Sequence, residues 1–227
     1  MKSIIITPTN NLEFSLDFYH QLGFTNLSDD PLWVSDGKAV IEINPDRFTR
    51  AGIKLFKESW AEEVEKVAGL TAVTTRENGC LFSDPSGVWI YLEESSPKIN
   101  IHSTPESYSV LGNFVGLSLE TTDIARSVRF YEILGFTQAG GAPEQGYVTY
   151  ALENFMITFM KPLACPHLFF NPSLTYFNGK NNLAVIENIR SLNITITEEI
   201  TYFNKQGIVD NVIIRDPGGY GFFIFSD

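Results

Sequence analysis

The sequence predicts an α+β protein built from four βαβββ modules, arranged as two tandem domains with mixed sheets. The first observation behind this prediction is an internal repeat. The 227-residue chain reads SLDFYHQLGFT from residue 15 and SVRFYEILGFT from residue 127, an offset of 112. The second observation is that each half shows a strand, a helix and then several strands, twice over. Repeats are best sought first, because a missed repeat changes the whole fold assignment.

Three further blocks recur in the same order. LWVSDGKAVIEINP (32–45) resembles TYALENFMITFMKP (149–162), SWAEEVEKVAGL (59–70) resembles NNLAVIENIRSL (181–192), and DPSGVWIY (84–91) resembles DPGGYGFF (216–223). The offset between copies only grows along the chain, which indicates a duplication with loop insertions in the second copy. In this alignment Phe159 stands opposite Glu42.

The first module begins with a β-branched run, Ser3–Thr7. A helix follows, because Asn10 and Glu13 have capping-box spacing and apolar residues recur at helical intervals. Gly23 stands where a helix usually ends. Asp36-Gly37 between two apolar runs predicts a hairpin turn, with Val40–Ile43 as the returning strand.

The second module repeats this order. Ile53–Phe56 is predicted as a strand and Trp60–Ala68 as a helix, within which Glu62 and Lys66 are an i,i+4 pair. The predicted strands that follow are Leu70–Thr74, Cys80–Phe82 and Val88–Leu92. The expected domains are residues 1–95 and 113–227, separated by a polar, proline-containing linker at 96–112.

Composition narrows the function classes. The formal net charge of −11 argues against non-specific nucleic-acid binding and against docking on an anionic membrane, since both need Lys and Arg. Two cysteines provide no disulfide framework, and no apolar run is long enough for a signal peptide or a membrane span. We therefore expect a cytoplasmic protein whose partner is a small-molecule ligand, with no nucleic-acid or membrane partner, and possibly a homodimer.

The repeated FY…LGF motifs, with DPSGVWIYL and DPGGYGFFI at the last strand of each half, resemble the vicinal-oxygen-chelate superfamily. This superfamily includes glyoxalase I, bleomycin-resistance proteins and extradiol dioxygenases. The resemblance spans nearly the whole chain and implies paired βαβββ modules that form cup-shaped sheets. A ligand or metal sits in the cup of such proteins. Because the superfamily supports many chemistries, the resemblance implies the fold more strongly than the activity.

The resemblance also implies where metal ligands would stand. The first strand of each half would begin with His or Gln, and Ile4 and Gly116 occupy those positions. The last strand would end with Glu, and Tyr91 and Phe223 stand there. The fifth-strand segments AGIKLF and PSLTYF contain no His or Glu. These side chains are poor ligands for divalent ions, so we expect no metal and no cofactor.

Strands alternate faces, so the family ligand positions mark the residues that face each cup. We expect more room in the second cup than in the first, because Gly116 and Gly221 remove bulk from its floor. An apolar or aromatic guest suits these surfaces. The candidate ligand-binding residues of the first cup are Ile4, Ile6, Glu42, Trp89 and Tyr91, and those of the second are Gly116, Ser118, Glu120, Gly221, Phe223 and Phe225.

Glu120 is the single acid in the cup-facing register of a first strand and is the one candidate catalytic residue, as a general base or an anchor. A strand-end position that reaches water explains it equally well. Glu42 could line the first cup or lie on a half-exposed face. The histidines His20, His102 and His167 lie on unrelated segments, and PLACPHLFFNP (162–172) is either a lid or a stiff connection.

The sequence therefore favours a metal-free small-molecule-binding protein of the glyoxalase/bleomycin-resistance type. One alternative is a superfamily enzyme, a lyase or dioxygenase with an unrecognised metal site or metal-free acid/base catalysis. A second alternative is a scaffold whose cups are filled by their own side chains. Whether the chain is an enzyme stays open at this stage.

Overall fold

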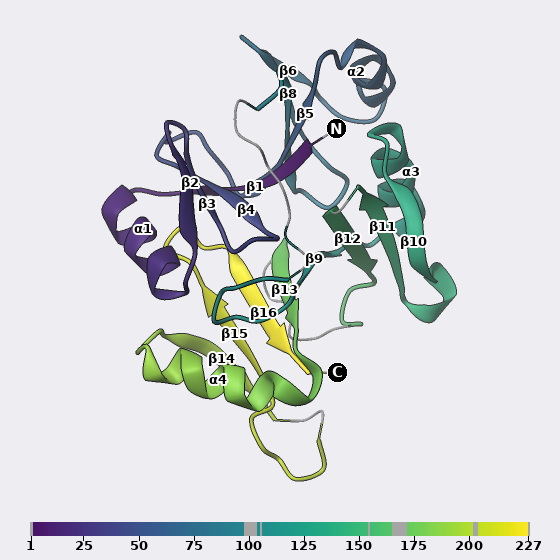
Figure 1. Cartoon of the computed structure of the whole chain (residues 1–227). Coiled ribbons are helices and arrows are strands. Elements are labelled where there is room, and N and C mark those ends of the chain that lie inside the picture. The colour runs from purple at the N-terminus through teal and green to yellow at the C-terminus, as the bar shows by residue number, and fades with distance from the viewer. Residues whose placement is uncertain are drawn as a thin grey trace.

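The structure, a computed structural model, describes residues 2–97, 104, 106–153, 155–164, 172–201 and 204–226. It contains two eight-stranded mixed sheets, and the strands of each sheet come from one half of the chain (Figure 1). The elements of the first half are β1 (Lys2–Pro8), α1 (Leu12–Gln21), β2 (Thr25–Asp29), β3 (Leu32–Ser35), β4 (Val40–Asn44), β5 (Gly52–Lys57), α2 (Ala61–Val67), β6 (Thr74–Arg76), β7 (Gly79–Ser83) and β8 (Trp89–Glu94).

The second half repeats this series and adds two short 3₁₀ turns. Its elements are β9 (Phe114–Glu120), α3 (Ile124–Ile133), β10 (Thr137–Ala142), η1 (Pro143–Gln145), β11 (Tyr147–Leu152), β12 (Phe155–Met160), β13 (Ser173–Phe177), η2 (Gly179–Asn181), α4 (Asn182–Ser191), β14 (Ile196–Ile200), β15 (Asn211–Arg215) and β16 (Gly221–Phe225).

The strand order confirms the predicted fold class. The first sheet runs β2-β3-β4-β1-β5-β8-β7-β6, and the second runs β10-β11-β12-β9-β13-β16-β15-β14, which is the same order. The two modules of a half join through their first strands, since β1 pairs antiparallel with β5 and β9 with β13. Modules therefore pair within a half, a point that the sequence left open.

Two local predictions were wrong by a few residues. The side chain of Asn11, not Asn10, caps α1 by accepting a hydrogen bond from the backbone N–H of Phe14 at 3.0 Å. The segment predicted as the strand Leu70–Thr74 is mostly irregular loop, and β6 begins only at Thr74. Its apolar residues Leu70 and Val73 pack against the core from outside the sheet, which explains why the run looked like a strand.

One hydrophobic core serves both halves. It includes Ile5, Ile90 and Leu92 from the first sheet and Leu117 and Ile224 from the second. Helix α1 lies beside the β14–β16 end of the second sheet, and α3 lies beside α2 (Figure 1). Phe18 of α1 meets Phe222 of β16 edge-on, with 6.2 Å between the ring centres.

The duplicated motifs bond to each other across the two halves. Tyr19, from the first FY motif, donates its hydroxyl to Asp216 of the second DP turn at 2.8 Å. Tyr131, from the second FY motif, donates to Asp84 of the first DP turn at 2.9 Å. All four side chains are buried. The motifs that revealed the repeat therefore fasten one copy to the other.

The second DP turn also lies very close to the first half. A Cβ atom added to Gly218 would come within 2.1 Å of the carbonyl oxygen of Pro8. Only glycine fits at such an approach. Among the residues that the structure describes, no helix has the length and apolar character needed to cross a membrane.

Candidate functional site: the two cups

Strand register identifies the residues that face each cup. In the first sheet Ile4 pairs with Lys54, and Lys54 pairs with Tyr91. In the second sheet Gly116 pairs with Thr175, and Thr175 pairs with Phe223. The third family ligand position, which the sequence located only to a segment, therefore falls on Lys54 in the first cup and on Thr175 in the second.

These two sets of residues do not fit a divalent metal ion. Lys54 is an ammonium that repels a cation, and the side chains of Ile4 and Phe223 have no donor atom. Across the described ranges, no three His, Cys, Asp or Glu side chains come together as a metal site would require. No step of any reaction is therefore assigned to a metal here.

The first cup is filled by its own side chains around Glu42. One carboxylate oxygen of Glu42 accepts from the Trp33 indole N–H at 3.0 Å and from the Lys54 ammonium at 2.6 Å. The other oxygen accepts from the Asn44 amide at 2.8 Å. The Glu42 side chain is 2% exposed and that of Lys54 is 11% exposed. Of the two positions considered for Glu42, the structure has it in the cup, inside a hydrogen-bonded polar network.

Apolar and aromatic residues close the rest of the first cup. Ile4 packs with Trp33 and Phe56 in a cluster separate from the main core, and Ile6 is buried as well. The Tyr91 hydroxyl accepts from the backbone N–H of Arg50 at 2.9 Å and donates to its carbonyl oxygen at 3.1 Å. The segment before β5 therefore covers this cup. Trp89 is half-buried at the start of β8.

Electrostatics within the first cup are balanced by neighbouring charges of both signs. Burial raises the pKa of Glu93, which lies on the cup-facing register of β8, while Lys54 and Arg76 lower it. The Arg76 guanidinium also lies 5.7 Å from the centre of the Tyr91 ring. The first cup therefore contains a buried, hydrogen-bonded carboxylate at Glu42 and has charged side chains of both signs beside it.

The second cup contains a cavity of about 540 Å³. Phe223 and Phe225 form one wall, with parallel rings whose centres are 4.9 Å apart. None of the described lining side chains carries a charge. The lining residues are Val115, Ser118, Tyr147, Thr149, Thr158, Met160, Ala164, Thr175, Phe223 and Phe225.

Three replacements explain why one cup is full and the other is open. Register pairs Trp33 with Glu42 in the first sheet, and Thr149 with Thr158 in the equivalent strands of the second. Lys54 and Thr175 are equivalent in the same way. The hydrogen-bonded Trp33–Glu42–Lys54 set, which we call the plug, thus has three threonines in its place in the second cup. The smaller side chains leave the space that the plug fills.

This equivalence corrects the sequence alignment. In the first sheet Ile6 pairs with Glu42. Ser118, which is the counterpart of Ile6 in the second sheet, pairs with Thr158. The partner of Glu42 in the second half is therefore Thr158, not Phe159, and Phe159 lies in the main core. A one-residue slip moves every side chain of a strand to the other face. The slip hid Thr149 and Thr158 from sequence reasoning, together with Tyr147 and Met160.

The predicted reason for the room in the second cup was also wrong. Gly116 has φ +128°, and a Cβ atom built on it would meet the Met156 carbonyl oxygen at 2.4 Å. It marks an irregular pairing of β9 with β13, and its missing side chain relieves a clash with β12. Neither Gly116 nor Gly221 lines the cavity. Of the six second-cup candidates, Ser118, Phe223 and Phe225 are lining residues.

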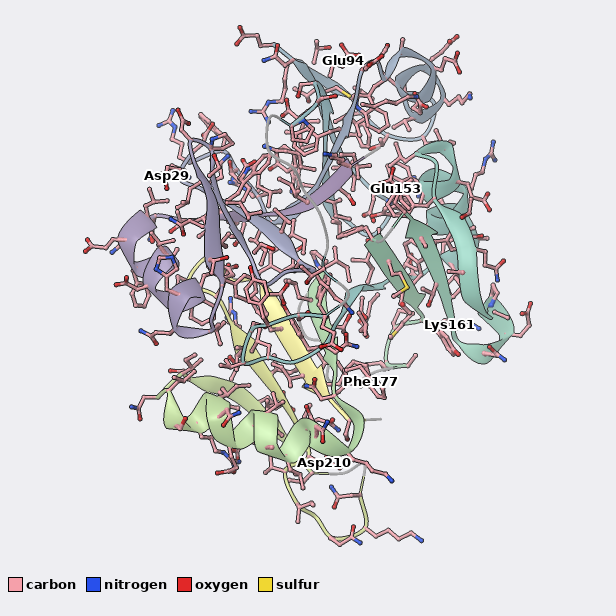
Figure 2. All side chains as sticks on the ribbon, in the orientation of Figure 1. Asp29, Glu94, Glu153, Lys161, Phe177 and Asp210 are labelled. Carbon is pink, nitrogen blue, oxygen red and sulfur yellow. The ribbon has the colours of Figure 1, made fainter. Side chains whose placement is uncertain are left out.

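Glu120 lies at the end of β9, outside the cavity lining. Its carboxylate accepts a hydrogen bond from the backbone N–H of Leu163 at 3.3 Å. This contact ties β9 to the segment after β12, which begins at Lys161, labelled in Figure 2. The geometry agrees with the explanation of Glu120 as a strand-end residue. It does not bring the Glu120 carboxylate to the cavity where a guest would lie.

The remaining candidates lie apart from the cups. His20 is on α1, where its Nε2 is 2.8 Å from the side-chain oxygen of Asn26. Burial raises the pKa of Cys80 to about 11, so its thiol stays protonated near neutral pH. His102 and most of the proposed lid at 162–172, with Cys165 and His167, lie outside the described residues.

Comparison with solved structures agrees with this architecture. A catechol 2,3-dioxygenase matches 97% of this chain and 85% of its own, with a TM-score of 0.54 at 14% identity. The 2,3-dioxygenase LapB from Pseudomonas sp. KL28 matches 99% and 91%, with a TM-score of 0.54 at 15% identity. A mutant 4-hydroxymandelate synthase from Streptomyces coelicolor matches 97% and 90%, with a TM-score of 0.54 at 10% identity.

No protein-family model matches the sequence, and no curated protein matches it either. At these identities the structural likeness shows the fold alone. The chain has the vicinal-oxygen-chelate fold, as its repeated motifs predicted, and the comparisons leave its chemistry to be argued from the cups.

Proposed function

We propose that this protein binds an apolar or aromatic small molecule in the second cup, without a metal. One observation supports the proposal above all. A cavity of about 540 Å³ faces the sheet where the fold normally places its ligand, and the plug that fills the first cup is absent from it. Ligand sites typically measure 300–1,000 Å³ and are largely apolar with a few polar groups.

The walls favour an aromatic guest. Phe223 is 5% exposed and stacks on Phe225, and these rings join Ile200, Ile213 and Met160 in a cluster distinct from the main core. A flat guest on such a wall gains from apolar burial and from aromatic contact, each pair adding about 0.5–1.5 kcal/mol. Phe225 continues the wall to Phe177, 5.2 Å away, which is labelled at the end of β13 in Figure 2.

The two alternatives receive less support. The alternative of a scaffold with filled cups agrees with the first cup, but it does not explain the cavity in the second cup. An enzyme is suggested by the dioxygenases among the structural neighbours. At the positions where the family resemblance implies metal ligands, the second cup has Gly116, Thr175 and Phe223. Glu120, the candidate base, lies outside the lining. Binding without chemistry is therefore the function that these residues support best.

A fluorescent apolar probe tests this proposal. N-phenyl-1-naphthylamine is uncharged, and its emission rises in apolar sites. We expect saturable binding that is lost in Thr158→Trp, because the indole would occupy the cavity. Met156→Trp is the matched control, since Met156 lies two residues earlier on the same face of β12 but outside the lining. Unchanged binding in Thr158→Trp would show that the probe sits elsewhere.

A cytoplasmic location and a homodimer remain predictions. Cell fractionation tests the first, and sedimentation or size-exclusion measurements test the second. Neither is needed for the binding proposal, because every described lining residue comes from one half of one chain.

A further inference from the structure

We propose that the guest of the second cup is an uncharged aromatic molecule with a carbonyl oxygen, which Ser118 and the neighbouring threonine pair bind through their hydroxyl protons. This inference rests on the proposed function and specifies its ligand class. In this inference Ser118 is the residue that determines specificity. Its counterpart in the first cup is Ile6, which is not part of the plug.

Ser118 presents a hydroxyl to the cavity, beside the hydroxyls of three lining threonines. Its residue is 3% exposed and lines the cavity. Within the described part of the chain, its side chain has no hydrogen-bond partner. Among the described residues, the fully buried side-chain atoms that lack a partner do not include the Ser118 oxygen, so this oxygen is reached from the cavity. A hydroxyl at a cavity wall bonds to water or to a guest there. A guest atom within reach of Ser118 would supply the missing bond.

The threonines beside Ser118 add a second available proton. Thr158 is directly opposite Ser118 on the neighbouring strand, and Thr149 is opposite Thr158 on the next. The hydroxyls of Thr149 and Thr158 are 2.9 Å apart, and one proton is enough to form that bond. Whichever threonine accepts this bond keeps its own hydroxyl proton for a guest. Thr175 is different, because its hydroxyl already donates to the Gly116 carbonyl oxygen at 2.7 Å.

Two donors on adjacent strands match a carbonyl oxygen. Adjacent strands are about 4.8 Å apart, so one acceptor between them can approach both hydroxyls. A carbonyl oxygen has two lone pairs and no proton of its own, and can accept both bonds. An aromatic ketone, quinone or lactone has such an oxygen on a flat apolar body that suits the Phe223 wall.

The lining also excludes charged relatives of such a guest. Among the lining residues that the structure describes none is cationic, so a carboxylate would lose its hydration there without a compensating ion. The first cup shows the contrast, since its buried acid Glu42 is paired with Lys54. The same position in the second cup has Thr175.

A matched set of competitors tests the ligand class by displacement of N-phenyl-1-naphthylamine at pH 7. The set is 2-acetylnaphthalene, 2-isopropenylnaphthalene, which replaces the carbonyl oxygen by carbon, and 2-naphthoate. Because each net hydrogen bond corresponds to about 0.5–1.5 kcal/mol, two such bonds correspond to about tenfold or more. We expect the ketone to bind about tenfold tighter than the alkene, and the carboxylate to compete at least as poorly as the alkene.

Two variants identify the anchor. Ser118→Ala should reduce the preference for ketone over alkene to about threefold or less, while the probe itself still binds. Thr137→Ala is the control, and its preference should stay near the wild-type value, because Thr137 is exposed on β10 and is not among the lining residues.

Two results would overturn the inference while leaving the proposed function intact. One is equal displacement by ketone and alkene, and the other is competition by the carboxylate as strong as that of the ketone. A preference that persists in Ser118→Ala would remove Ser118 from the role. Failure of the proposed function gives a different result, in which the probe does not bind or binds equally to Thr158→Trp.

Discussion

Single side chains decide whether a cup is closed or open. Glu42 brings a charge into the interior, and the charge is tolerated because Lys54 and the Trp33 indole both bond to the same carboxylate oxygen. Buried ion pairs contribute little net stability compared with apolar packing, but removal of one partner leaves an uncompensated charge. The plug is therefore stable only as a complete set, whereas the threonines of the second cup impose no such demand.

Lys54→Met tests this dependence. The substitution leaves Glu42 buried without its counter-charge, so the free energy of unfolding should fall by about 3–5 kcal/mol in urea denaturation. Arg190→Met is the control, because Arg190 and its partners Glu187 and Glu199 are substantially exposed. Exposed pairs contribute about 0–1 kcal/mol. Equal, small losses in both variants would show that the Glu42–Lys54 pair is not a closed interior contact.

At the scale of elements, helices and turns of opposite halves are fastened by buried acids. Asp216 accepts from Thr7 at 2.6 Å and from Tyr19 at 2.8 Å, and both donors belong to the first half. Asp36 accepts from Tyr176 of the second half at 3.0 Å. Burial raises the pKa of Asp216, Asp84 and Asp36, while their hydrogen bonds lower it by less.

The raised pKa values predict how stability depends on pH. An unfolded aspartate titrates near 3.9, so between that pH and the higher native pKa the native state binds more protons than the unfolded state. The free energy of unfolding then falls as pH rises through this window. Denaturation of Asp216→Asn from pH 4 to 7 should give a shallower fall than the wild type. Identical slopes would show that Asp216 does not titrate in this window.

The elements also show what the sequence could and could not predict. The FY and DP motifs predicted the duplication and the strand order, because the same local turn and helix chemistry recurs in both copies. They did not predict that Tyr19 bonds to Asp216 rather than to the Asp84 of its own half, since docking of the halves is a three-dimensional property. The cavity was missed as a set of residues because a gap-free alignment put Phe159, not Thr158, opposite Glu42.

At the scale of the whole molecule, duplication has produced two cups with different contents on one shared core. The halves have the same strand order, so the contrast between the plug and the three threonines is a difference of side chains, not of topology. The filled cup adds packed interior to the first sheet. The open cup leaves space on the second sheet, and its described lining includes the Ser118 hydroxyl and a stacked aromatic wall.

The most direct test of this account transfers the plug to the second cup. Thr149→Trp, Thr158→Glu and Thr175→Lys are combined in one chain, so that the introduced groups can satisfy one another as Trp33, Glu42 and Lys54 do. The measurement is the stoichiometry of N-phenyl-1-naphthylamine binding, with cooperative thermal unfolding as the check on folding. The account predicts one site per wild-type chain and none in the triple variant. A folded triple variant that binds the probe with wild-type stoichiometry and affinity would contradict it.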